Sequence, residues 1–195
     1  MKENQNGRSM IEMLGVLAII GVLSIGGIAG YSKAMSKYRV NKTADQISQL
    51  AQNIRVLYSS QKNYSGLNYN VIKKAHLAPD DMYETTSTTN LTHPFGGLVE
   101  VGVYGKMSGG DNKAFLIRLD GIPQEACIEL LTQDWGAGAS SGLIALGAGS
   151  HGEAYYNNCS NSSSRQCASQ GVMPVNTAIS ICSGAINNNI TWKFY

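Results

Sequence analysis

Two short glycine-containing segments have the spacing of loops that bind nucleotides or carry a catalytic serine. The segment 147–152, GAGSHG, has the GxGxxG spacing that lets a backbone approach a dinucleotide pyrophosphate, and the segment 138–142, GASSG, has the GxSxG spacing of a nucleophilic serine. A dinucleotide loop must open an apolar-striped helix, but a polar segment follows residue 152. The serine motif needs a preceding strand, whereas the strand is expected after it. The sequence therefore predicts neither a dinucleotide site nor a serine hydrolase.

The histidines do not have the spacing of a metal site. His76, His93 and His151 are far apart in the chain, and no CxxC pair accompanies them. We expect surface histidines, no metal ion and no cofactor. The 15 Lys and Arg residues nearly balance the 13 Asp and Glu residues in a chain that is 14% charged, so no nucleic-acid partner is expected. The chain is predicted not to be an enzyme.

One carboxylate, that of Glu12, interrupts a long apolar segment. Residues 10–29 contain fourteen apolar side chains, four glycines, Ser24 and Glu12. About 20 such residues cross the hydrocarbon core of a bilayer as a helix, so a membrane-spanning helix is favoured over a buried core helix or a removed signal. A carboxylate near the bilayer centre costs about 2.5–3.5 kcal/mol. We predict that Glu12 is functional, with an interfacial residue facing headgroups as the alternative.

The charges and the cysteines after this segment indicate opposite topologies. Four basic residues follow it closely, and only two precede it, which favours a cytoplasmic location for the later part of the chain. The four that follow are Lys33, Lys37, Arg39 and Lys42. All four cysteines also follow the segment, in a region rich in Ser, Asn and Gly that is typical of an oxidising compartment. They are Cys127, Cys159, Cys167 and Cys182. We give the cysteines more weight, and they permit three pairings.

The apolar spacing predicts one long helix followed by a sheet. Helical periodicity continues beyond residue 30 to about residue 59, with Leu57 among the apolar positions and Gln46 among the polar ones. The spacing then alternates, which predicts a hairpin of strands at 98–104 and 114–119.

The remaining chain is expected to alternate between short helices and strands. A helix is predicted after Pro123 to about residue 135, a strand at 142–147, a helix at 175–182 and a strand at 190–195. The predicted fold class is α+β, in which a long N-terminal helix packs on an antiparallel sheet.

The start of the chain resembles the class III signal of type IV prepilins. The leader MKENQNG ends at Gly7, Arg8 follows, and Glu12 comes just before the uninterrupted apolar residues. In that family a prepilin peptidase cleaves after the glycine and methylates the new amino group, and a Glu is the fifth mature residue. The resemblance implies cleavage between Gly7 and Arg8, N-methylation of Arg8 and a role for Glu12 in assembly. An amine from a neighbouring copy 4 Å away would favour Glu12 burial by about 4 kcal/mol.

A second resemblance covers part of the later chain. The segments HPFGG at 93–97 and NKAFLIRLDGIPQEACIELL at 112–131, with a late cysteine, are similar to type IVb pilins of the toxin-coregulated pilus kind. Those pilins join the cysteine of this helix to a cysteine near the end of the chain. The resemblance implies a Cys127–Cys182 bond, which leaves Cys159 with Cys167. We expect the region 127–182 to form exposed surface, with partner contacts around 154–170.

Together these observations predict a structural subunit, or pilin, of a type IV pilus. Residues 1–7 would be the leader, 8–30 the membrane-spanning and filament-core helix, 31–60 the amphipathic helix of the head, and 61–195 the globular head. The expected partners are other copies of the chain, prepilin peptidase, the inner-membrane assembly machinery and membrane lipid. The pilin would lie in the inner membrane and then in an extracellular filament serving adhesion or aggregation. The alternatives are a pseudopilin of a type II secretion system and an uncleaved membrane-anchored binding module.

Overall fold

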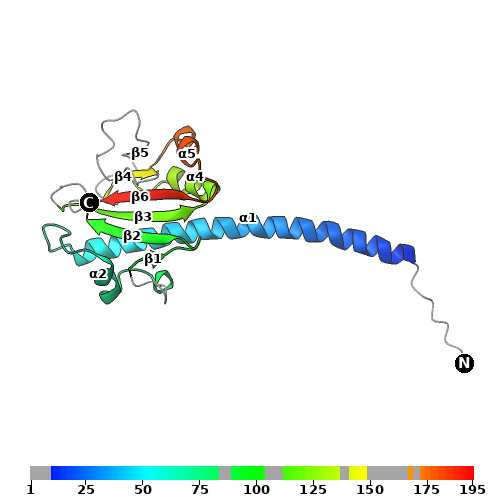
Figure 1. Cartoon of the computed structure of the whole chain (residues 1–195), viewed down its shortest axis with the longest axis horizontal. Coiled ribbons are helices and arrows are strands. Elements are labelled where there is room, and N and C mark those ends of the chain that lie inside the picture. Colours follow the sequence, from blue (N-terminus) through cyan, green and yellow to red (C-terminus); the bar gives the residue numbers. More distant parts are fainter. Residues whose placement is uncertain (1–9, 84–88, 104–111, 137–140, 149–166, 169–171) are drawn as a thin grey trace, which may run out of the picture. The chain divides into compact units, whose positions relative to one another are not determined.

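The computed structural model describes residues 10–83, 89–103, 112–136, 141–148, 167–168 and 172–195, and for residues 167–168 it describes the backbone. The chain divides into two compact units, Met1–Tyr38 and Arg39–Tyr195. One long helix, α1, contributes to both units, and the second unit adds the sheet and the short helices (Figure 1).

Helix α1 runs from Met10 to Leu57 without a break, as its apolar spacing predicted. In the first unit its large apolar side chains are exposed, from Met10 at 83% to Ile28 at 70%. Among the described residues it is the one helix that is long and apolar enough to cross a membrane, judged by length and composition. Apolar surface in water is unfavourable by roughly 25 cal/mol per Å², so this part of α1 requires lipid or protein around it.

The second half of α1 contributes one buried stripe to the head. Its buried apolar residues recur three or four positions apart, and they are Val40, Ala44, Ile47, Leu50, Ala51 and Ile54. The prediction was wrong at two positions, because Leu57 is 41% exposed whereas Gln46 is buried. The buried Gln46 side chain donates a hydrogen bond to the carboxylate of Asp81, which also pairs with Lys42 at 2.5 Å, while the Gln46 Oε1 accepts no hydrogen bond from the described residues.

The head is built on a six-stranded sheet in the order β1-β2-β3-β6-β4-β5, and every neighbouring pair is antiparallel. The strands are β1 Leu91–Thr92, β2 Leu98–Val103, β3 Phe115–Ile122, β4 Leu143–Ala148, β5 Cys167–Ala168 and β6 Asn188–Phe194. The predicted hairpin is confirmed as β2–β3, with Val101 opposite Ile117. Strand β6, the last in the chain, lies between β3 and β4 (red in Figure 1).

Four short helices complete the described part of the chain: α2 Tyr69–Lys74, the 3-10 helix η1 Asp80–Met82, α4 Gln124–Thr132 and α5 Val175–Ile181. Helices α4 and α5 were predicted, whereas α2, η1, β1 and β5 were not. The six residues of α2 are too few for a repeating apolar pattern. Its start is fixed instead by Asn68, whose side chain accepts a hydrogen bond from the Val71 N–H at 3.1 Å.

One continuous core joins α1, the sheet and α4. Trp192 of β6 is fully buried and meets Trp135 edge to face, with ring centroids 5.0 Å apart. The Trp135 indole N–H donates to the Leu130 carbonyl of α4 at 2.7 Å. These contacts fix α4 beside β6, and α4 carries the first cysteine of the disulfide described below.

Candidate assembly helix and disulfide junction

Glu12 lies in the first turn of α1 and is exposed among apolar neighbours. It is the one acidic residue between positions 4 and 44 of the sequence. The positive end of a helix dipole stabilises a carboxylate in the first turn, but in an apolar environment that carboxylate still requires a cationic or hydrogen-bonding partner. The assembly role of Glu12 stays a prediction.

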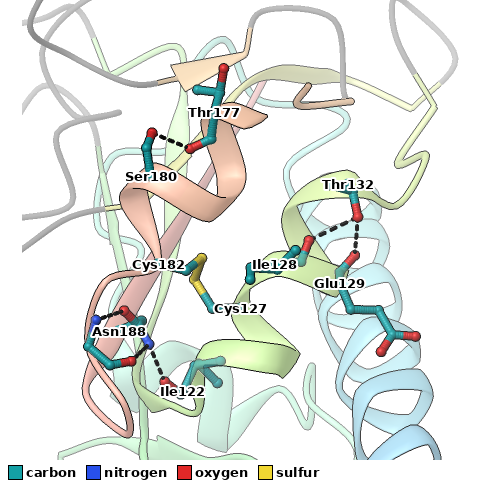
Figure 2. Close-up of a disulfide and its surroundings, with 10 residues drawn as sticks. Ile122, Cys127, Ile128, Glu129, Thr132, Thr177, Ser180, Cys182 and Asn188 are labelled. Carbon is teal, nitrogen blue, oxygen red and sulfur yellow. Dashed lines mark hydrogen bonds between the residues drawn. A yellow bond between two sulfur atoms is a disulfide. The ribbon is translucent and has the colours of Figure 1, made fainter. Parts of the chain in front are cut away.

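The predicted bond between Cys127 and Cys182 is confirmed. The two residues lie 55 positions apart in sequence, with Cα atoms 6.0 Å apart, and both are completely buried. Cys127 is within α4, and Cys182 caps the C-terminal end of α5. Figure 2 shows the bond joining these two helices. The disulfide thus fixes the segment after residue 172 to the helix that packs beside β6.

A buried asparagine holds the same segment beside the disulfide. The Asn188 amide donates to the Ile122 carbonyl at 3.0 Å and to the Gly184 carbonyl at 2.5 Å, and its oxygen accepts from the Gly184 N–H at 3.0 Å (Figure 2). The Gln124 N–H donates to the Ala185 carbonyl at 3.2 Å. The turn between α5 and β6 is therefore attached to the end of β3 and the start of α4 without help from the disulfide.

The two segments that carried the type IVb resemblance in the head meet in space. His93 Nε2 lies 2.8 Å from the Asp120 carbonyl oxygen, and a Cβ added at Gly97 would clash with that oxygen and with the His93 ring. Gly121 has a φ of +74°, and its Cβ position lies 3.6 Å from the Gly97 Cα. The HPFGG turn therefore needs glycine at position 97 so that it can lie against the Asp120–Gly121 turn.

The prediction that the histidines are surface residues was wrong for His93, which is 5% exposed. Its Nε2–H donates to Asp120, and its Nδ1 accepts from the Phe95 N–H at 3.3 Å. Burial lowers the pKa of His93 from its usual 6.5, and this effect exceeds the opposing effects of the Asp120 carbonyl and carboxylate. Protonation of Nδ1 would remove its ability to accept the Phe95 hydrogen bond.

We expect acidification from pH 7.5 to 5.5 to reduce the stability of the head, in part through His93. The unfolded imidazole titrates near 6.5 and the folded one lower, so below pH 6.5 the unfolded chain binds more protons. The stabilisation is complete above pH 6.5 and decreases by at most about 1.4 kcal/mol per pH unit as the pH falls toward the folded pKa. Denaturant unfolding followed by tryptophan fluorescence measures this slope.

His93→Gln should reduce that slope, because glutamine can donate to the Asp120 carbonyl but does not titrate. The matched control is His76→Gln, since His76 is exposed. An equal pH slope in wild type and His93→Gln would show that His93 does not contribute.

Comparisons with known proteins match nearly the whole chain. The family model for bundlin matches residues 32–189. The chain belongs to the bundlin family. The major structural subunit of the bundle-forming pilus of Escherichia coli O127:H6 is 26% identical over 193 residues, which cover 98% of this chain and 95% of that protein. The toxin coregulated pilin of Vibrio cholerae is 25% identical over 158 residues, which cover 76% of this chain and 65% of that protein.

A solved structure supports the fold of this bundlin-family chain. The type IV b pilin from Salmonella typhi superimposes with a TM-score of 0.54 at 16% identity, over 78% of this chain and 97% of that one. The family and the relatives confirm the resemblance to type IVb pilins and the predicted function as a structural subunit of a type IV pilus. They favour a pilus subunit over the pseudopilin alternative.

Several predicted site residues of this bundlin-family chain lie outside the described residues. Gly7, Arg8 and Cys159 are among them, and so is most of 154–170, where partner contacts were expected. The expectation that region 127–182 forms exposed surface was wrong for α4 and β4, because most of the residues of β4 and the apolar face of α4 are buried in the core. Cys167 is in β5, but its side chain is not described. Leader cleavage, N-methylation and the second disulfide therefore stay predictions.

The two glycine-containing motifs are described only in part. Of 147–152, Gly147 and Ala148 belong to β4, and of 138–142, Ser141 and Gly142 come just before that strand. The Ser141 hydroxyl donates to the Gly136 carbonyl and accepts from the Leu143 N–H at 3.3 Å. Within the described ranges no group of three His, Cys, Asp or Glu side chains is placed to hold a metal ion.

Proposed function

We propose that this type IVb pilin is cleaved between Gly7 and Arg8, that α1 holds it in the inner membrane, and that it then polymerises through α1 into an extracellular filament for adhesion or aggregation. The observation that carries the proposal is the exposed apolar half of α1 with one carboxylate near its start. Such a surface is stable in lipid or between copies of the same helix.

Pairing between the Glu12 carboxylate and the amino group that cleavage creates would allow α1 to move from lipid into a filament. In lipid the carboxylate of Glu12 has no fixed partner, and in a filament the amine at Arg8 of a neighbouring copy would supply one. At 4 Å and an effective dielectric near 20 the attraction is about 4 kcal/mol, enough to offset the 2.5–3.5 kcal/mol for placing Glu12 in an apolar environment. The pairing would also select the register between neighbouring helices.

Intact-mass measurement of the native protein tests this proposal. Loss of MKENQNG together with the gain of one methyl group supports a processed pilin. An intact leader supports the uncleaved membrane-anchored module. Electron microscopy of filaments sheared from the cells, with identification of this chain in them, tests polymerisation separately.

Gly7→Val should leave uncleaved precursor in the inner membrane. The reason is steric, because the peptidase requires a small residue on the leader side of the cut in the family that this signal resembles. Immunoblotting of membrane fractions should show nearly all of the variant at precursor size. The matched control is Asn4→Val, which places the same side chain in the leader away from the cut. Efficient processing of Gly7→Val would contradict the assigned site.

A further inference from the structure

Two lysines and two tyrosines lie on α1 just beyond its apolar segment. Tyr31 is 68% exposed, Tyr38 is 57% exposed, and Lys33 and Lys37 are also exposed. All four belong to the first unit, Met1–Tyr38. We call this group the basic collar. In membrane proteins lysine is concentrated at the cytoplasmic end of a membrane segment and is normally scarce at the other end. The basic collar lies at the end that the proposed topology places outside the cytoplasm, and pilus assembly through Glu12 does not account for its positive charge.

The position of the basic collar along α1 matches the headgroup layer of a bilayer. If the apolar segment ends at Ala29, a rise of 1.5 Å per residue places the Cα of Tyr31 about 3 Å, Lys33 about 6 Å and Lys37 about 12 Å beyond the hydrocarbon core. The headgroup layer adds about 5–8 Å on each side of that core. Helical side chains tilt toward the N-terminus, which is the bilayer side here, and long lysine side chains extend further in that direction. Both ammonium groups can therefore reach phosphate depth.

The basic collar also has two chemically different sides. Lys33 and Lys37 are four residues apart and share one side of the helix. Tyr31 and Tyr38 are seven residues apart and share another side, about 130° around the helix from the lysines on average at 100° per residue. Tyrosine is enriched where helices pass through the membrane surface. A pair of ammonium groups on one side presents two point charges to anionic headgroups.

We propose that the basic collar binds the phosphate groups of anionic phospholipids in the leaflet next to the head, before the subunit enters a filament. This inference rests on the proposed membrane stage. Each lysine near an anionic surface strengthens binding to that surface by up to about fivefold, the equivalent of about 1 kcal/mol. The lysines would thus select acidic lipids around the membrane segment and fix its depth, while the tyrosines anchor another side of the helix.

Lipid selectivity of the full chain tests this proposal. The protein is reconstituted into phosphatidylcholine vesicles with a minority of phosphatidylglycerol, and electron paramagnetic resonance compares the association of spin-labelled forms of both lipids. We expect wild type to favour phosphatidylglycerol severalfold at low salt and less at high salt. Lys33→Gln/Lys37→Gln should lose most of that preference. The matched control is Lys73→Gln/Lys74→Gln, which removes the same charge from exposed positions on α2.

The outcomes separate this inference from the proposed function. Vesicle flotation reports insertion into the membrane. A wild-type chain that floats but favours neither lipid would therefore contradict lipid binding by the basic collar and leave the proposed membrane stage intact. A chain that does not float contradicts both. An equal loss of preference in the two double variants would assign the effect to net charge and overturn the proposal. Unchanged preference in Lys33→Gln/Lys37→Gln with loss of filaments would assign the lysines to contacts between copies, which also overturns it.

Discussion

Glu12→Ala is expected to abolish filaments while leaving the folded subunit in the membrane. The variant removes a carboxylate from an exposed apolar helix, so insertion into lipid should become more favourable by up to about 2.5–3.5 kcal/mol. Assembly should lose an attraction of about 4 kcal/mol for each added copy, which is roughly a thousandfold in the equilibrium for subunit addition. Removal of the carboxylate relieves its burial cost in lipid and in the apolar filament interior alike, so the lost attraction is what opposes transfer of the subunit from membrane to filament.

Two further substitutions separate charge from shape at this position. Glu12→Gln keeps the size of the side chain and removes its charge, so we expect it to fail like alanine. Glu12→Asp keeps the charge on a shorter side chain and should retain part of the assembly. Filaments are quantified by shearing and immunoblotting, and the membrane pool by fractionation. Wild-type amounts of normal pili from Glu12→Ala would remove the role assigned to this carboxylate.

The long helix and most of the sheet strands could be predicted because their patterns repeat over many residues. Helix α1 has 48 residues, and one apolar stripe persists along its head portion. The error at Gln46 has a local cause, since a buried amide needs a specific partner, and that partner, Asp81, comes from a segment with no periodic signal. Sequence periodicity predicts which face of a helix is buried but not which polar group is satisfied there.

The order of the strands could not be predicted from the sequence. Strand β6 has clear strand composition, but its place between β3 and β4 depends on contacts that are distant in the chain, such as Ile117 with Trp192. The turn at His93 was missed for a similar reason. Its ring is buried because the Asp120 carbonyl arrives from another turn, and the only sequence signal was the pair of glycines at 96–97.

Only the resemblance predicted the disulfide pairing. Spacing alone left three pairings open, and nothing in the composition distinguishes Cys127–Cys182 from the others. The hydrogen bonds of the Asn188 side chain could not be predicted at all, because asparagine is common in this region and its partners at Ile122 and Gly184 depend on the fold. The Cys127–Cys182 bond and the Asn188 hydrogen bonds together hold the segment after residue 172.

Removal of the Cys127–Cys182 bond should destabilise the head by about 4 kcal/mol. The bond closes a loop of about 55 residues, and in the chain-entropy model a loop of that length gives roughly this value. The Asn188 hydrogen bonds and the Gln124–Ala185 contact remain in the variant, so the segment should still dock. The head should therefore fold, with a free energy of unfolding that is lower by the loop-closure contribution.

Cys127→Ala/Cys182→Ala tests this expectation in the full chain in detergent, with denaturant unfolding followed by tryptophan fluorescence. Trp192 is fully buried beside α4, so its emission reports loss of this part of the core. The matched control is Cys159→Ala/Cys167→Ala. If those two cysteines are paired, their short loop is worth only about 2.5–3 kcal/mol.

The comparison of the two double variants also tests how much each disulfide contributes to the stability of the head. A larger loss for Cys127→Ala/Cys182→Ala is the expected order, because the longer loop restricts the unfolded chain more. A larger loss for Cys159→Ala/Cys167→Ala would mean that the segment after residue 172 is held mainly by the Asn188 hydrogen bonds and by backbone contacts. Non-reducing peptide mapping completes the test, since a Cys127–Cys159 or Cys127–Cys167 peptide from the native protein would contradict the pairing.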